Sequence, residues 1–181
     1  DSDYGVFSIL PPYNTVHAQL INNLGKLVTN TAGIGITYHA VADLDGSFNS
    51  YSEGKGNFRT YAPALFGLTL APETGLPVPG PESFSMPGRT NTPQAMKYEE
   101  SMKWFAAYGI PITPYDDAGK PNQYPMMRLM ATNGSGQVLA MTDIVLPVSD
   151  EMDCKLCHAS GSGLAAEPVG GWVFDPHPGR D

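Results

Sequence analysis

Residues 124–146 read Tyr-Pro-Met-Met-Arg-Leu-Met-Ala, then Thr-Asn-Gly-Ser-Gly, then Gln-Val-Leu-Ala-Met-Thr-Asp-Ile-Val-Leu. Two apolar runs therefore flank a short loop that contains an Asn-Gly pair, and this pattern predicts a β-hairpin. We interpret the methionines of the first run as adaptable core filling, because the flexible thioether side chain packs well into irregular spaces. The hairpin indicates a sheet-based fold.

Two extended segments precede the hairpin in the chain. Residues 6–21 are rich in β-branched and aromatic side chains. Pro11 and Pro12 interrupt this run, which favours an edge strand or a strand that changes sheets. A turn signal at residues 22–25 follows, and residues 35–42 are a second strand candidate.

One clear helix is predicted over residues 93–108. Thr92 suits the N-cap position, and Pro93 suits the first position of a helix. Gly109 and Pro111 supply the stop signals. The side chains that recur at helical spacing are Ala95, Tyr98, Met102 and Phe105. We expect this helix to cover one face of a sheet.

The segment before this helix is irregular. Residues 67–92 are rich in proline and glycine, and we predict a long loop there. A short helix near residues 57–65 is compatible with the sequence, although Pro63 should break or end it.

The composition limits the fold class. The chain has 181 residues, 41% of them apolar, which fits one domain with a sizeable core. Its 20 glycines and 17 prolines argue against a helical bundle. We therefore predict a single mostly β domain over residues 1–181, either β-sandwich-like or α+β with an antiparallel sheet.

The net charge, the lack of long apolar runs and the first residues of the chain limit the functions that the sequence predicts. The net charge is −8, whereas a protein that binds the phosphate backbone needs the opposite balance, so nucleic acid is not an expected partner. The chain has no apolar run of membrane-spanning length. The start lacks Met and a basic-then-apolar leader, so we interpret the chain as a mature chain or an excised piece of a longer protein.

The chemistry centres on Cys154-Lys-Leu-Cys157-His158. Cys-x-x-Cys-His is the attachment pattern for c-type haem. The two thioethers reach one edge of the porphyrin, and the next residue brings its imidazole to the iron. Cys154 and Cys157 are thus the expected attachment points for one haem c, and His158 is the expected proximal axial ligand. The pattern occupies residues 154–158, near the C-terminal end of the chain.

Two cysteines at this spacing also occur in three other kinds of site. Structural zinc would need two further ligands from His17, His39 or His177, and no second Cys pair or His-x₃₋₅-His follows. A thioredoxin-like redox pair should lie in a βαβ unit, which the acidic and Gly/Ser-rich flanks do not indicate. A plain disulfide leaves the adjacent His158 unexplained.

With these residues the chain resembles a mono-haem c-type cytochrome. The late motif differs from the common small cytochrome c, and the Pro and Gly content differs from the four-helix cytochrome c-prime. The sheet-based cytochrome P460 and c-prime-beta group also carries a late motif, and residues 171–174 are similar to its following apolar segment. No lysine here can be assigned to the porphyrin cross-link of P460 proteins. Four segments are similar to β-rich secreted bacterial proteins with one haem motif: residues 11–19, 113–119, 124–131 and 143–163.

The second axial ligand decides the function. His17 is the first candidate for this distal position, because the alternation of Val16, Ala18 and Leu20 would hold its strand rigidly and present the imidazole on the other face. The Met126/Met127 pair is the next choice. Two strong ligands suit outer-sphere electron transfer, whereas an open position allows small-molecule chemistry.

We therefore expect a periplasmic or extracellular electron carrier, and not primarily an enzyme. A redox partner protein, other cytochromes or self-assembly would pass the electrons on. The alternatives are a haem enzyme or gas sensor with an open sixth coordination site, and a structural or cell-surface module stapled by haem or zinc.

Overall fold

The computed structural model describes residues 13–56, 58–77 and 82–148. By compactness the chain divides into Asp1–Ser149 and Asp150–Asp181, and every described residue belongs to the first unit. In these residues the protein is mostly β, as predicted, with strands in two antiparallel sheets and one short helix. No helix among the described residues is long and apolar enough to cross a membrane.

The larger sheet has four strands in the order β3-β2-β6-β7. They are β2 (Ile34–Val41), β3 (Gln94–Ala95), β6 (Met126–Asn133) and β7 (Val138–Val145). The predicted hairpin is confirmed as β6 and β7, and the predicted strand at 35–42 is confirmed as β2. Asn133 closes the hairpin loop, since its side-chain Oδ1 accepts hydrogen bonds from the backbone N–H groups of Ser135 and Gln137.

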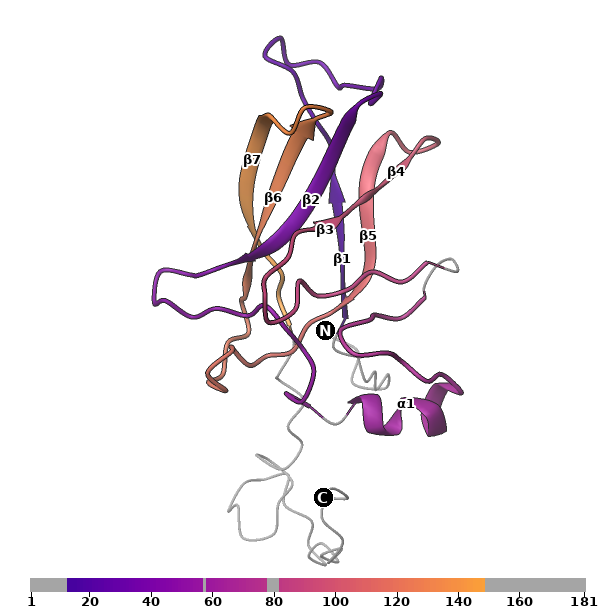
Figure 1. The fold of residues 1–181 in the computed structure, drawn as a ribbon, viewed down its shortest axis with the longest axis vertical. Coiled ribbons are helices and arrows are strands. Elements are labelled where there is room, and N and C mark those ends of the chain that lie inside the picture. Colours follow the sequence, from indigo (N-terminus) through magenta and orange to yellow (C-terminus); the bar gives the residue numbers. More distant parts are fainter. Residues whose placement is uncertain (1–12, 57, 78–81, 149–181) are drawn as a thin grey trace, which may run out of the picture. The chain divides into compact units, whose positions relative to one another are not determined.

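The smaller sheet has three strands in the order β1-β5-β4. They are β1 (Tyr13–Ala18), β5 (Trp104–Pro111) and β4 (Lys97–Glu99). The extended segment predicted over residues 6–21 is confirmed at 13–18 and ends earlier than predicted, and residues 6–12 lie outside the described residues. Figure 1 shows β1, β4 and β5 together on one side of the unit, with β7 at the far edge of the other sheet.

The core lies between the two sheets. Alternate residues of each strand point inward, as the period of two in a strand requires. Tyr38 of β2, Met127 of β6 and Phe105 of β5 belong to one buried apolar cluster, to which both sheets contribute. This packing makes the unit a β-sandwich, the first of the two predicted architectures.

The predicted helix at 93–108 is wrong. This segment forms β3, β4 and the first part of β5. Tyr98 and Phe105 do pack together, with ring centroids 5.0 Å apart, but as cross-strand partners in an antiparallel pair and not on one side of a helix. Met102, expected on the buried helix face, lies half exposed in the turn between the strands.

The backbone at Lys103 is also incompatible with the predicted helix, and Asn91 just before that segment pairs with β2. Asn91 has φ 51° and Lys103 has φ 56°, both in the left-handed region. The Asn91 side chain donates to Ala40 O and accepts from Ala40 N, at 3.0 and 2.9 Å, and so continues the edge of β2 like an added strand. Tertiary pairing therefore overrides the local helical pattern.

The short predicted helix is present as α1 (Phe58–Phe66). Pro63 was expected to break or end it, but it lies inside the helix, which continues for three more residues. The Gly67 N–H donates to Pro63 O at 3.0 Å and closes the last turn, while Gly67 itself has φ 67°.

The predicted loop at 67–92 is confirmed over its described residues, which form no helix or named strand beyond α1. This loop packs closely on β5 where Gly75 of the loop lies against Gly109 of the strand. A Cβ on Gly75 would lie 1.8 Å from Gly109 O, and a Cβ on Gly109 would lie 2.7 Å from Leu76 O. Gly109 is thus a point of close backbone approach inside β5, and not the helix stop that the sequence indicated.

Candidate functional site

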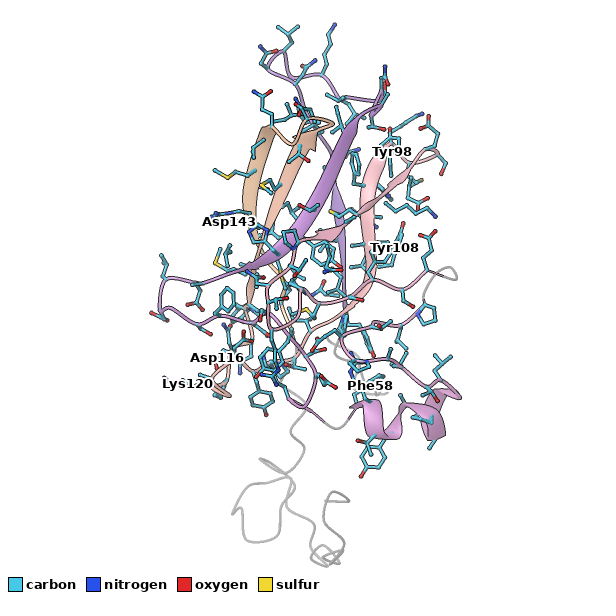
Figure 2. The ribbon with its side chains drawn as sticks, viewed as in Figure 1. Phe58, Tyr98, Tyr108, Asp116, Lys120 and Asp143 are labelled. Carbon is cyan, nitrogen blue, oxygen red and sulfur yellow. The ribbon has the colours of Figure 1, made fainter. Side chains whose placement is uncertain are left out.

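His17 lies on the outer face of the smaller sheet. Its neighbour Val16 points into the core, so the alternation of β1 places the imidazole outside, as predicted. The ring stacks on Trp104 with centroids 4.3 Å apart and planes at 12°. Tyr108 meets it edge-on at 5.5 Å, and Figure 2 shows Tyr108 on that side of the unit.

These three rings cover the middle of β5. Ala106 pairs with His17 in the sheet and lies on β5 between Trp104 and Tyr108. Although it faces outward, Ala106 is fully buried, because the large side chains around it exclude water. The Trp104 indole Nε1 is also buried and has no hydrogen-bond partner. The outer face of the smaller sheet at His17 is therefore an aromatic surface that shields Ala106 and the indole Nε1 from water, while the imidazole of His17 stays exposed.

His39 lies on the outer face of the other sheet. β2 places it opposite Arg128 of β6, and Arg128 lies opposite Asp143 of β7. Arg128 binds Asp143 through two hydrogen bonds of 2.7 and 2.8 Å, a bidentate pair. Burial and the Arg128 charge lower the pKa of His39, against an opposing effect of Asp143, so its neutral form is favoured. Its Nδ1 is buried and has no partner.

The two histidines do not meet. His17 and His39 lie on the outer faces of different sheets, and both inner faces contribute to the core between them. Two packed sheets are about 10 Å apart. One zinc ion therefore cannot bind both side chains in this fold, so His17 and His39 cannot together complete a zinc site with the two cysteines.

The two methionine candidates differ in accessibility. Met127 is fully buried in the core. Met126 points to the opposite face of β6 and is half-buried. Using Met127 as an iron ligand would require the core to open, so within this pair only Met126 is placed to meet a group at the surface.

Residues Cys154, Cys157 and His158 lie outside the described residues, and so does His177. Within the described ranges no three His, Cys, Asp or Glu side chains gather in a group that could hold a metal ion. The described residues thus offer isolated metal-binding side chains and no cluster of them, and His17 is the histidine among them whose imidazole is exposed.

A buried polar cluster holds the loops beneath the sandwich, and the sequence did not predict it. Lys55 Nζ lies 2.6 Å from Asp117 Oδ1, and the Lys55 side chain is only 6% exposed. Lys55 also donates to Asn49 Oδ1 and to Tyr115 O, at 2.9 and 3.2 Å. Ser50 donates to Asp117 Oδ2 at 2.6 Å. Burial acts to raise the pKa of Asp117, but the hydrogen bonds from Lys55 and Ser50 outweigh it and lower the pKa.

Every strong donor and acceptor in this cluster has a partner in the fold. The cluster ties the loop after β2 to the loop after β5, and Figure 2 shows Asp116 and Lys120 in the same region. Asp116 closes its own loop by accepting from Ala118 N and Lys120 N. We therefore assign the cluster to loop stability. Partners 60 to 67 residues apart left no local signal in the sequence.

Comparison of the chain with protein-family models, with curated proteins and with solved structures finds no match.

Proposed function

We propose that this chain is an electron-transfer c-type cytochrome with one covalent haem, attached at Cys154 and Cys157 and bound axially by His158. The observation that carries the proposal is the sequence Cys154-Lys-Leu-Cys157-His158. The haem would supply an iron that alternates between two oxidation states, and the protein would set its potential through ligands and burial. Periplasmic or extracellular assembly follows from the resemblance to c-type cytochromes.

His17 is our candidate for the second axial ligand. Its imidazole is exposed, makes no hydrogen bond within the described residues, and stands on a rigid strand pair. Trp104 restricts the ring to one plane through their stacking contact. An imidazole held in this way needs little ordering to accept a metal, which is the property that a distal ligand requires.

The charge of the chain bears on the redox partner. Asp150, Glu151 and Asp153 precede the motif, and the whole chain carries a net charge of −8. A negative surface attracts and orients a basic partner during encounter. We therefore propose a basic redox protein, or another cytochrome with a basic face, as the partner.

The test is the visible spectrum of the full chain, produced in cells that attach haem c. We expect a pyridine haemochrome typical of two thioether links, sharp α and β bands on reduction, and a Soret band that CO leaves unchanged. His17→Ala should open the iron and let CO shift the Soret band. His39→Ala is the matched control, since it removes an imidazole from the opposite sheet, and it should leave the spectrum unchanged.

Other outcomes separate the alternatives. A Soret band that CO shifts in the unaltered protein would favour the haem enzyme or gas sensor. Colourless protein with zinc by elemental analysis would favour the stapled structural module. Colourless protein with both thiols open to alkylation would refute haem and zinc together. If His17→Ala leaves the iron closed, the cytochrome proposal stands and the ligand assignment fails, with Met126 next to test.

A further inference from the structure

Among the described residues, no strand pairs with the outer edge of β7. It is the last strand of the four-stranded sheet, and within the described residues it pairs only with β6. Figure 1 shows it at the outer edge of that sheet. Seven of its eight residues are exposed, and the eighth, Ile144, is half-buried. An edge of this kind presents a row of backbone N–H and C=O groups that can pair with another strand.

The side chains of β7 are unusually apolar for such an edge. Ten large apolar side chains are exposed in the described part of the chain, and four of them lie on this one strand. They are Val138, Leu139, Met141 and Val145. Natural edge strands are commonly protected by lysine, proline, short length or a bulge. β7 is eight residues long and contains no lysine and no proline, and a register shift at Leu139, opposite Ala131 and Thr132, is the one protective feature of this kind on it.

Charge on β7 does not oppose association. Asp143 is its only ionisable residue, and Arg128 of β6 neutralises it through the bidentate pair. A basic partner would find no free carboxylate on this strand. Two copies of the chain, in turn, would bring no bare like charges together along it. The charge pattern therefore favours a second copy over a partner selected by charge.

The sequence of β7 is also complementary to itself. In an antiparallel pair of two β7 strands, the register that places Ala140 opposite its own copy places Leu139 opposite Met141 twice. The same register places Val138 opposite Thr142 twice, and the small Ala140 side chains lie at the two-fold axis. Leu139 and Met141, the two exposed apolar residues next to the axis, thus gain apolar partners, and each contact occurs twice, as a two-fold interface requires.

We propose that the chain forms a two-fold dimer through β7, with the two larger sheets joined into one continuous antiparallel sheet. Backbone hydrogen bonds across the axis would supply the affinity, and the paired Leu139 and Met141 would fix the register. The interface uses only residues of the described unit and needs no haem. Its test is therefore independent of the spectroscopic test of the proposed function.

The experiment is sedimentation equilibrium of the full chain over a range of protein concentrations, with hydrogen exchange of residues 138–145 followed in parallel. We expect the mass to rise from monomer to dimer and the β7 amides to exchange more slowly as the dimer forms. The double variant Leu139→Lys, Met141→Lys should raise the dimer dissociation constant at least about tenfold, because it places lysines together at the axis. Leu44→Lys, at a fully exposed leucine in the turn after β2, is the matched control and should dissociate like the unaltered protein.

Three results would overturn the inference. The first is a monomer at every concentration, with unprotected β7 amides. The second is a monomer whose β7 amides are already protected, which would mean that another segment of the same chain covers the edge. The third is a dimer that the double variant leaves intact. Far-UV circular dichroism verifies that the variants fold, which is expected because both positions are exposed.

Discussion

The imidazole of His17 lies flat on the indole of Trp104, with the ring centroids 4.3 Å apart, although 86 residues separate the two in the chain. The contact exists because β1 and β5 pair antiparallel with His17 opposite Ala106, two residues from Trp104. This arrangement both presents the imidazole and restricts its rotation. It is the most specific feature of the described residues that bears on the proposed haem ligand.

Removing this imidazole should expose Trp104. In a Trp172→Phe background, which leaves one tryptophan, His17→Ala should shift the fluorescence emission to longer wavelength and make it easier to quench with acrylamide. A stacked aromatic pair contributes about 1 kcal/mol, so the free energy of unfolding should fall by about that amount. Gln19→Ala, at an exposed residue just beyond β1, should change neither property. An unchanged emission in His17→Ala would contradict the stacking.

The contact between Gly109 and Leu76 predicts a large effect from one methyl group. Gly109→Ala should lower the free energy of unfolding by about 3 kcal/mol, because the Cβ meets Leu76 O at 2.7 Å and the φ of 63° disfavours an L side chain. Gly25→Ala is the control, with φ 72° but no atom within 4 Å of the Cβ. Gly25→Ala should lower the free energy of unfolding by about 1 kcal/mol, because only the backbone strain of the positive φ is added. Equal losses in urea unfolding would show that the close approach does not exist.

Local patterns predicted β2, β6 and β7, the three long strands of the larger sheet, because the signals for these strands lie within each segment. The β6–β7 hairpin combines two apolar runs with an Asn-Gly loop, and β2 alternates buried and half-buried side chains between turn signals. The exposed position of His17 was predictable for the same reason, from its neighbour Val16. Its stacking partner was not, since Trp104 reaches it only through long-range pairing.

The segment at 93–108 shows where such patterns fail. Tyr98 and Phe105 are seven residues apart, which is two helical turns, but it is also the separation of a cross-strand pair in a short hairpin. The local sequence therefore does not distinguish a helix from a hairpin here. Pairing of β3 with β2 and of β5 with β1, two strands far upstream in the chain, gives the sheet instead of the helix. The Lys55 cluster likewise joins distant loops, and the residues of the haem motif themselves lie outside the described residues.

Among the ion-paired lysines, replacing Lys55 should lower the stability most. Lys55→Met removes the charge beside Asp117 and leaves Asn49 Oδ1 and Tyr115 O without their donor. We expect a loss of about 3 kcal/mol in the free energy of unfolding. Lys97→Met breaks the Lys97–Glu82 pair, in which both side chains are about half exposed, and should leave the free energy of unfolding nearly unchanged because water screens the pair. Similar losses from both variants would show that the Lys55 cluster does not hold the loops.

The same cluster predicts an acid dependence of stability. Because the folded-state pKa of Asp117 is below its ordinary value, its contribution is complete above the unfolded pKa of 3.8 and is lost as the pH falls through the folded value. Urea midpoints measured from about pH 6 down to about pH 3 should therefore fall in the unaltered protein. The fall should be smaller in Asp117→Asn, and an equal fall in both proteins would count against the lowered pKa.

His39 predicts a second dependence, nearer neutral pH and with the same sign. Its folded pKa is below 6.5, because burial and Arg128 disfavour the cation more than Asp143 favours it. Above about pH 7.5 both folded and unfolded chains hold His39 neutral, and stability is unaffected by this group. As the pH falls through 6.5 the unfolded chain takes up the proton first, so the folded state loses stability until the folded pKa is passed. His39→Gln should therefore reduce the drop in urea midpoint between about pH 7.5 and about pH 5.5. If the urea midpoint of His39→Gln falls as much as that of the unaltered protein, a group other than His39 causes the fall.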